Sequence, residues 1–379
     1  MGTGPKKIMF YVQHLLGIGH LARASLICEQ FAQQGHDITM VMGGTPVNGF
    51  PSGSVKVLQL PILKAGVLRF NDLTDEHGQI VGDTYKQNRC ELLLEFFNSF
   101  QPDVLIIEAF PFGRRQMRFE LLPLLEAAKQ ATKKPIIAGS VRDIVQEKNN
   151  PKRAIETVET LNKYFDLLLV HGDPSFAKLD ETFERTNEIQ QLVRYTGLVA
   201  GKVTPLMGPS YDVVVSAGGG VAGEAIMLNA LKAKPLSKLA TANWVFLVGP
   251  NLCPHVRAKL SEMSDNSVTI ENSRPDFRAL LARAKLSISQ AGYNTTADIL
   301  QAKCSSILVP YAQGGETEQS LRAEKLQQQK LVSIVNEDEL TPQKLAHAID
   351  IMMSTRGSVA RTDINMTGAS KSVELLLML

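Results

Sequence analysis

A chain of 379 residues exceeds the usual size of a single hydrophobic core and therefore predicts two domains. Its 40 Lys and Arg residues nearly balance 38 Asp and Glu residues, and a net charge of +2 gives no support to nucleic-acid binding, which requires a basic stripe. No apolar run reaches the roughly 18 residues of a membrane span. The four cysteines are far apart in the sequence, which favours neither disulfides nor a zinc site. We therefore expect a cytoplasmic protein with reduced thiols.

The first half of the chain alternates between short apolar runs and amphipathic stretches. Lys7–Val12 predicts a strand, residues 21–34 a helix and Asp37–Met42 a second strand, which together form a βαβ unit. Further strands are predicted at 58–60, 103–107, 135–139 and 166–171, and further helices at 85–100, 119–129 and 154–164. Continuous apolar runs of this kind are typical of a parallel sheet that is covered on both faces.

The second half repeats this architecture after a Gly- and Pro-containing linker at 201–209. Its predicted strands are 211–216, 243–248, 268–271, 286–289, 306–309 and 331–335, and its predicted helices are 222–231, 276–283, 294–301, 316–328, 341–353 and 370–378. The prediction is an α/β protein with two doubly wound Rossmann-like domains, residues 1–200 and 201–379, that face a cleft. The last helix is free to cross back to the first domain.

Two segments of the second half predict a phosphate and sugar site. Gly218, Gly219 and Gly220 follow a strand and precede a helix, where backbone N–H groups and the helix dipole favour an anion. The alternative is a tight turn with no ligand. The second segment, residues 287–326, combines strand, polar turn, helix, strand and polar loop. Its Asp298 lies one turn inside a helix, in position to accept hydrogen bonds from sugar hydroxyls, unless it is an ordinary exposed residue.

These segments resemble the MurG-type glycosyltransferases of family 28, which have the GT-B fold. The matching elements are Gln290-Ala291-Gly292, Thr295 or Thr296, Asp298, Val309-Pro310 and Glu318-Gln319, together with the glycine loops at 17–20 and 218–220. The family's arginine before Ala-Gly is Gln290 here, and its glutamate is the shorter Asp298, so the base and sugar of the donor stay open. The resemblance implies a nucleotide-diphosphate sugar donor, a UDP-sugar by preference, bound by Gly19, Gly218, Gly219, Gly220, Gly292, Asn294, Thr295, Asp298, Gly314, Gly315, Glu316, Glu318 and Gln319.

His20 is the predicted catalytic base. It follows the first strand and a glycine turn, and an imidazole with a pKa near 6.5 can take a proton from an attacking hydroxyl. The alternative role is a helix cap or a donor-phosphate ligand. Glu108 and Asp143 follow the predicted strands 103–107 and 135–139 and are candidates to orient His20, and Asp143 is also a candidate to replace it. His171 is expected to be a structural histidine.

Four arginines are predicted to bind the acceptor or a phosphate. They are Arg23, Arg114, Arg115 and Arg142. The alternative for Arg114 and Arg115 is a surface pair that contacts Glu120 or Glu91. Arg23 belongs to a GxGHxxR element that is similar to one in PseG-type nucleotide-sugar hydrolases, which share the GT-B fold.

The resulting hypothesis is an inverting, metal-independent hexosyl- or N-acetylhexosaminyl-transferase of carbohydrate biosynthesis. It needs no cofactor and acts on a nucleotide-sugar and a hydroxyl acceptor. A hydrolase or 2-epimerase of the same fold, and a non-catalytic nucleotide-sugar binding protein, are the alternatives. The mixed apolar and basic segment at 60–69 leaves peripheral membrane contact open, with a buried loop as the other interpretation.

Overall fold

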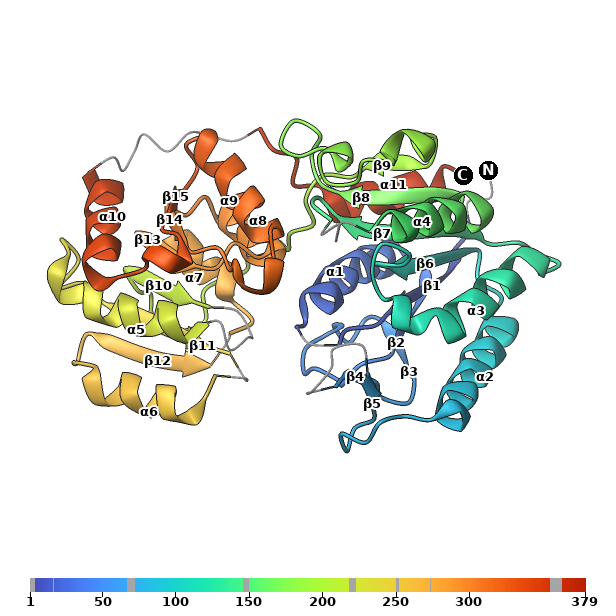
Figure 1. Cartoon of the computed structure of the whole chain (residues 1–379), viewed down its shortest axis with the longest axis horizontal. Coiled ribbons are helices and arrows are strands. Elements are labelled where there is room, and N and C mark those ends of the chain that lie inside the picture. The colour runs from blue at the N-terminus through green and yellow to red at the C-terminus, as the bar shows by residue number, and fades with distance from the viewer. Residues whose placement is uncertain are drawn as a thin grey trace. The chain divides into compact units, whose positions relative to one another are not determined.

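A computed structural model describes residues 4–15, 17–66, 72–145, 150–217, 223–249, 252–272, 274–354 and 363–379. The chain divides into two compact units (Figure 1). The first unit comprises Met1–Val199 together with Asn365–Leu379, and the second comprises Ala200–Ile364. The tail therefore returns to the first unit, which is one of the two arrangements that the sequence leaves open.

The first unit is built on a seven-stranded sheet with the order β3-β2-β1-β6-β7-β8-β9. The strands are β1 (Lys7–Val12), β2 (Asp37–Met42), β3 (Lys56–Gln59), β6 (Val104–Glu108), β7 (Ile136–Arg142), β8 (Leu167–His171) and β9 (Val193–Tyr195). All neighbouring pairs are parallel. The strand order reverses between β1 and β6, and we call this position the switch point of the sheet. Loops diverge at a switch point and leave room for a ligand beyond the carboxyl ends of the strands.

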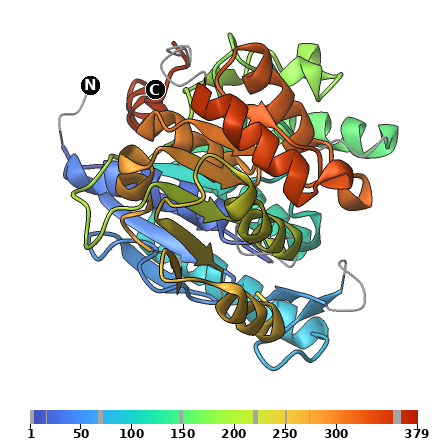
Figure 2. The same cartoon turned by 90° about the vertical axis from the view of Figure 1, so that its left-hand side faces the viewer.

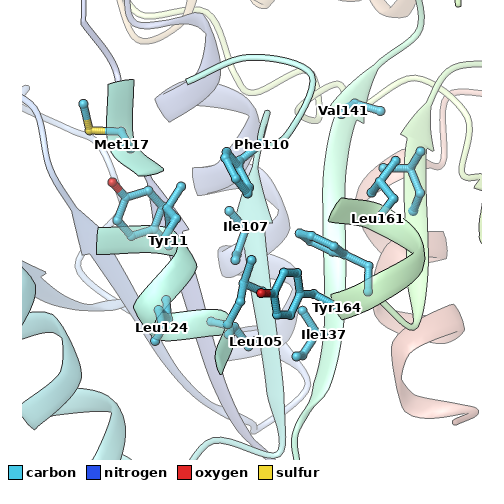
Figure 3. Close-up of a cluster of buried hydrophobic side chains, with 14 of the residues drawn as sticks. Tyr11, Leu105, Ile107, Phe110, Met117, Leu124, Ile137, Val141, Leu161 and Tyr164 are labelled. Atoms are coloured by element: carbon cyan, nitrogen blue, oxygen red, sulfur yellow. The ribbon is translucent and has the colours of Figure 1, made fainter. Parts of the chain in front are cut away.

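Helices cover both faces of this sheet. They are α1 (Gly19–Gln33), α2 (Asp83–Phe100), α3 (Arg118–Gln130), α4 (Pro151–Tyr164) and α11 (Gly368–Leu377). Successive side chains of a strand point to opposite faces. Tyr11 therefore packs with Leu124 of α3 and Leu161 of α4 in one buried cluster (Figure 3). Phe10 packs on the other face with α1 and with Val373 of α11, which explains why the tail belongs to this unit.

Several local features of the first unit differ from the prediction, and the short edge strand β9 was not predicted at all. The predicted strand 135–139 extends to Arg142, because Gly139 does not form a turn but fits against β8, where an added Cβ would lie 2.9 Å from the Leu168 side chain. A small antiparallel hairpin of β4 (Lys64–Ala65) and β5 (Leu73–Thr74) was not predicted. Part of the segment 60–69 lies outside the described residues. Within the described part of the chain, no helix has the length and apolar character of a membrane span.

The second unit repeats the same topology with a six-stranded parallel sheet, ordered β12-β11-β10-β13-β14-β15. Its strands are β10 (Val213–Ser216), β11 (Trp244–Val248), β12 (Val268–Asn272), β13 (Leu286–Ser289), β14 (Ser306–Leu308) and β15 (Ser333–Ile334). Its helices are α5 (Gly223–Ala233), α6 (Pro254–Met263), α7 (Phe277–Arg283), α8 (Tyr293–Ala302), α9 (Glu318–Gln328) and α10 (Pro342–Ser354) (Figure 2). The switch point of this sheet lies between β10 and β13.

The α6 helix was not predicted, and its composition gives the reason. Only Val256 and Leu260 of its ten residues are buried, so its apolar periodicity is weak. Both side chains join a core cluster with α5 and α10 on one face of the second sheet. Single turns of 3₁₀ helix lie in the connections at Arg115–Met117, Leu179–Glu181, Thr186–Glu188, Lys234–Leu236, Gln313–Gly315 and Glu337–Glu339.

Candidate active site

The switch point of the first sheet brings His20 and Glu108 together. Glu108 is the last residue of β6, and His20 is the second residue of α1, which follows β1. The Nδ1 atom of His20 lies 2.8 Å from Oε1 of Glu108. Glu108 is fully buried, whereas the His20 side chain keeps 21% of its surface exposed. The sequence prediction that Glu108 lies beside His20 therefore agrees with the geometry, and the catalytic role of the pair stays a prediction.

The hydrogen bond to Glu108 determines the tautomer of His20. A carboxylate can only accept, so the 2.8 Å contact to Glu108 favours a proton on Nδ1 and a lone pair on Nε2, over the longer 3.2 Å contact of Nδ1 with the donor Nη2 of Arg23. Burial lowers the pKa of His20 to about 3, and the charges of Arg114 and Arg23 also lower it, against the opposing effect of Glu108. The imidazole is therefore neutral at pH 7, with Nε2 as a hydrogen-bond acceptor. The expected pKa near 6.5 is wrong, because burial makes His20 a weaker base than a free imidazole.

Arg23 keeps Glu108 ionised in this buried position. Its Nη2 atom donates to Oε1 of Glu108, and its side chain is only 2% exposed. Burial by itself would raise the pKa of Glu108, but Arg23 and His20 outweigh it and lower the pKa to about 2. The main contact of Arg23 is thus inside the protein, which makes it a partner of the His20–Glu108 pair.

A buried chain of polar side chains continues behind Glu108. Ser140 donates from Oγ to Oε2 of Glu108, and the same Oγ lies 2.9 Å from Nε2 of His171. Nδ1 of His171 lies 2.9 Å from Oγ1 of Thr196. Burial, followed by the charge of Arg23, lowers the pKa of His171 to about 3. His171 is therefore a fully bonded internal histidine, as expected, while Ser140 and Thr196 were missed because nothing in the sequence distinguishes them from ordinary core polar residues.

Asp143 lies just beyond β7 and is completely buried. Its Oδ1 accepts a hydrogen bond from the backbone N–H of Ile144 at 2.8 Å. An added Cβ at Gly172 would lie 2.7 Å from the Cβ of Asp143, so the backbone at Gly172 packs closely against Asp143. The contact that orients His20 comes from Glu108, and the catalytic assignment of Asp143 stays a prediction.

His20 opens onto a cavity of about 430 Å³ in the first unit. The cavity lies beside the loop from Ala109 to Arg115 and the N-terminal turns of α4. Five arginines line it: Arg23, Arg114, Arg115, Arg142 and Arg153. The first four were predicted from the sequence, and Arg153 was not, because it lies on a helix distant in sequence from the glycine turn and the strand ends.

The expected alternative, a surface pair of Arg114 and Arg115 with Glu120 or Glu91, is wrong. Glu120 is buried and binds Arg89, whose Nε lies 2.6 Å from Oε2 of Glu120. Arg115 instead pairs with Glu156 at 2.6 Å. Tertiary packing decides these partners, because the helix that carries Glu120 turns that residue towards the core.

At the second switch point, the loop after β10 contains Gly218, Gly219 and Gly220, which lie outside the described residues. The loop after β13 is described, and its Gly292 is the N-cap of α8. Asn294 and Thr295 occupy the first turn of that helix and are half-buried. An added Cβ at Gly292 would meet no atom within 4 Å, so space lies beside this helix start. The donor-binding role of these residues stays a prediction.

Several predicted donor ligands form internal contacts. Oε1 of Gln319 accepts from the backbone N–H groups of Ala291 and Tyr311, each at 3.1 Å, and so links the loops after β13 and β14. Glu318 is buried and pairs with Arg322 at 2.6 Å. Glu316 accepts from the backbone N–H of Glu318 at the start of α9.

The loop that precedes α9 is also fastened to the body of the second unit. Gly314 and Gly315 belong to a 3₁₀ turn, and Gly315 has a φ of +77°, which suits a glycine. Oε1 of Glu337 accepts from the side-chain amide of Gln313 at 2.8 Å. These contacts hold the polar loop in place next to the second switch point.

Asp298 is neither exposed nor unpaired. Its Oδ1 lies 3.0 Å from Nη1 of Arg278, and its side chain is 16% exposed. Burial raises the pKa of Asp298, against the opposing charge of Arg278. Arg278 also donates from Nε to the backbone carbonyl of Lys202, at 3.0 Å. The interpretation as an ordinary exposed residue is therefore wrong, and sugar binding by Asp298 stays a prediction.

In the part of the chain that the structure describes, no group of three or more His, Cys, Asp and Glu side chains is placed to hold a metal ion.

Comparison with solved structures identifies the class of this fold as the GT-B glycosyltransferases. The calicheamicin glycosyltransferase CalG4 aligns with a TM-score of 0.63 and 17% identity, over 99% of this chain and 98% of its own. MurG of Acinetobacter baumannii aligns with a TM-score of 0.63 and 14% identity, over 99% of this chain and 100% of its own. UGT2 of Phytolacca americana, complexed with UDP-2-fluoroglucose and pterostilbene, aligns with a TM-score of 0.63 and 12% identity, over 99% of each chain.

The sequence of the second half matches a known domain family. Residues 213–376 match the model of the glycosyltransferase family 28 C-terminal domain. The second half therefore contains a glycosyltransferase family 28 C-terminal domain, and the predicted resemblance, glycosyltransferase class and Rossmann-like α/β fold are confirmed. A search of curated proteins finds no match to the sequence.

Proposed function

We propose that this protein transfers a sugar from a UDP-sugar to a hydroxyl acceptor with inversion at the anomeric carbon and without a metal ion. The observation that carries the proposal is the neutral His20, whose Nδ1 is bonded to buried Glu108 and whose Nε2 is left as an acceptor. The family 28 domain supplies the sugar-transfer chemistry that such a base would serve.

In the proposed step, the acceptor oxygen attacks the anomeric carbon while its proton moves to Nε2 of His20. The bond from that carbon to the diphosphate oxygen breaks, and UDP leaves with the electron pair. Glu108 stabilises the imidazolium that forms, because it is an anion in contact with Nδ1. Backbone N–H groups of the glycine loop at 218–220 and of the start of α8 are the proposed stabilisers of the diphosphate.

The test measures UDP release from a panel of UDP-sugars, with and without candidate hydroxyl acceptors. We expect release that depends on the acceptor, a product of opposite anomeric configuration by NMR, and activity that persists in EDTA. His20→Ala should lower turnover by about 10² or more while UDP still binds. The exposed His77→Ala serves as the control and should keep full activity.

Other outcomes would change the proposal. UDP release at the same rate with water alone would make the protein a hydrolase, and UDP-sugar binding without turnover would make it a binding protein. Retained turnover in His20→Ala would remove that residue from the role of base.

A further inference from the structure

The cavity beside His20 has an unusual charge distribution. Five of its lining residues are arginines, and none of its lining residues within the described part of the chain is Asp or Glu. The carboxylates nearby are already engaged by other cations. Glu108 binds Arg23 and His20, and Glu156 is shared between Arg115 and Arg118. The described lining residues of the cavity therefore carry an excess of positive charge.

Arg114 is held in position for a ligand. Its Nε donates to the backbone carbonyl of Gln13 at 2.6 Å, and the Gln13 side chain is fixed by buried Arg89 at 2.8 Å. Among the described residues, no carboxylate pairs with Arg114. Its backbone has a φ of +58°, a left-handed conformation that a non-glycine residue adopts at a cost, and such strain concentrates at binding sites.

The start of α4 also lines the cavity. Arg153 lies in the first turn of this helix, and among the described residues no carboxylate pairs with this side chain either. The backbone carbonyl of Arg153 accepts from Nη2 of Arg115 at 2.7 Å, which links two parts of the cavity lining. Asn150 caps the helix by accepting from the N–H of Arg153. The positive end of the helix dipole therefore adds to the charge of the guanidinium groups.

Apolar side chains line part of the cavity, beside the polar Gln116, Asn150 and Thr157. The apolar residues are Ala109, Phe112, Val141, Val145, Ala154 and Phe183. The volume of about 430 Å³ is within the range of small-molecule sites. A fully charged and hydrated anion would gain nothing from the apolar side, whereas the ring or carbon skeleton of an organic anion would bury apolar surface there.

From these contacts we propose that the cavity binds the acceptor, and that the acceptor is an organic anion whose phosphate or carboxylate group lies between Arg114 and Arg153. This acceptor site rests on the proposed function, in which His20 deprotonates the hydroxyl group of the acceptor. Guanidinium groups bind both oxyanions in a bidentate manner. Arg23 and Arg115, which have internal carboxylate partners, are support for the site and not its ligands.

Binding is measured by isothermal titration calorimetry, without any donor, with glucose 6-phosphate, glucuronate and neutral glucose as probes. We expect the two anionic sugars to bind and glucose to bind at least about tenfold more weakly. Arg153→Gln and Arg114→Gln should each weaken anion binding about tenfold or more. Because Arg153 is exposed, its variant should fold even if the Arg114 variant does not. Arg194→Gln, an exposed arginine of β9, is the matched control and should bind like the wild type.

Equal affinity for glucose and the anionic sugars, or unchanged anion affinity in Arg153→Gln, would overturn the proposal. Loss of UDP binding in the same variants, with sugar-anion binding retained, would also overturn it, because the arginines would then serve the donor. A second arm uses phosphatidylcholine vesicles with and without phosphatidylglycerol. Cosedimentation that needs phosphatidylglycerol and Arg153 would assign the anion to a lipid headgroup, whereas binding of the soluble sugars alone assigns it to a free acceptor.

These measurements are independent of the transfer reaction. Anion binding without turnover of any UDP-sugar would retain the site and refute the proposed function. Turnover with neutral acceptors only, together with no anion binding, would retain the function and refute the site.

Discussion

The two units have sheets of the same topology but use their switch points in different ways. The first unit gathers ionisable side chains there: His20, Glu108 and Arg23 lie in mutual contact, with His171 behind them. The described part of the second switch point instead uses side chains to hold backbone, as Gln319 does for two loops. The same fold thus gathers ionisable side chains at one sheet and fixes backbone at the other, because a switch point supplies space and helix starts but does not dictate residue type.

The variant Glu108→Gln tests most directly whether the charged side chains at the first switch point stabilise the protein. The amide cannot balance the buried charge of Arg23, so we expect the free energy of unfolding to fall by about 3–5 kcal/mol. Urea denaturation measures this change. Glu156→Gln is the control, because its pairs with Arg115 and Arg118 are partly exposed, and it should cost at most about 1 kcal/mol. Similar losses in both variants would contradict a special role for the first switch point.

Acid titration gives the next largest effect. The pKa of His171 is about 3 when folded and about 6.5 when unfolded, so below pH 6.5 the unfolded chain binds a proton that the folded protein does not. Stability should therefore fall with falling pH, by about 1.4 kcal/mol per pH unit from this residue, until about pH 3.

The variant His171→Gln should reduce this slope in urea denaturation at pH 7, 6 and 5. The exposed His77→Gln should retain the wild-type slope. An unaltered slope in His171→Gln would show that this histidine is protonated in the folded state as easily as in the unfolded chain.

The smallest expected effect tests the second unit. Gln319→Ala leaves two backbone N–H groups without their acceptor and should cost about 1–2 kcal/mol. Because the linked loops carry the predicted donor residues, UDP affinity by calorimetry should fall as well. Gln328→Ala, an exposed position at the end of the same helix, should change neither quantity. A loss of UDP affinity with no loss of stability would make Gln319 a donor ligand instead of a link between loops.

Much of the architecture was predictable from local pattern, and the exceptions have local reasons. Continuous apolar runs predicted nearly every strand of the two main sheets, because both faces of each sheet are covered by helices. The α6 helix was missed because it buries only two side chains. The strand β7 was predicted too short because Gly139 resembles a turn residue, although it serves close packing against Leu168.

For the site, the sequence by itself determined which residues stand at the ends of strands and the starts of helices, and hence that His20 and Glu108 are candidates. Those positions follow from local periodicity and glycine turns. Only the tertiary structure decided the partners: Glu108 for His20, Glu156 for Arg115 and Arg278 for Asp298. It also brought Arg153 and Arg114 into the lining of the same cavity. Pairing and burial depend on contacts between residues far apart in the chain, and a single sequence holds no local signal for them.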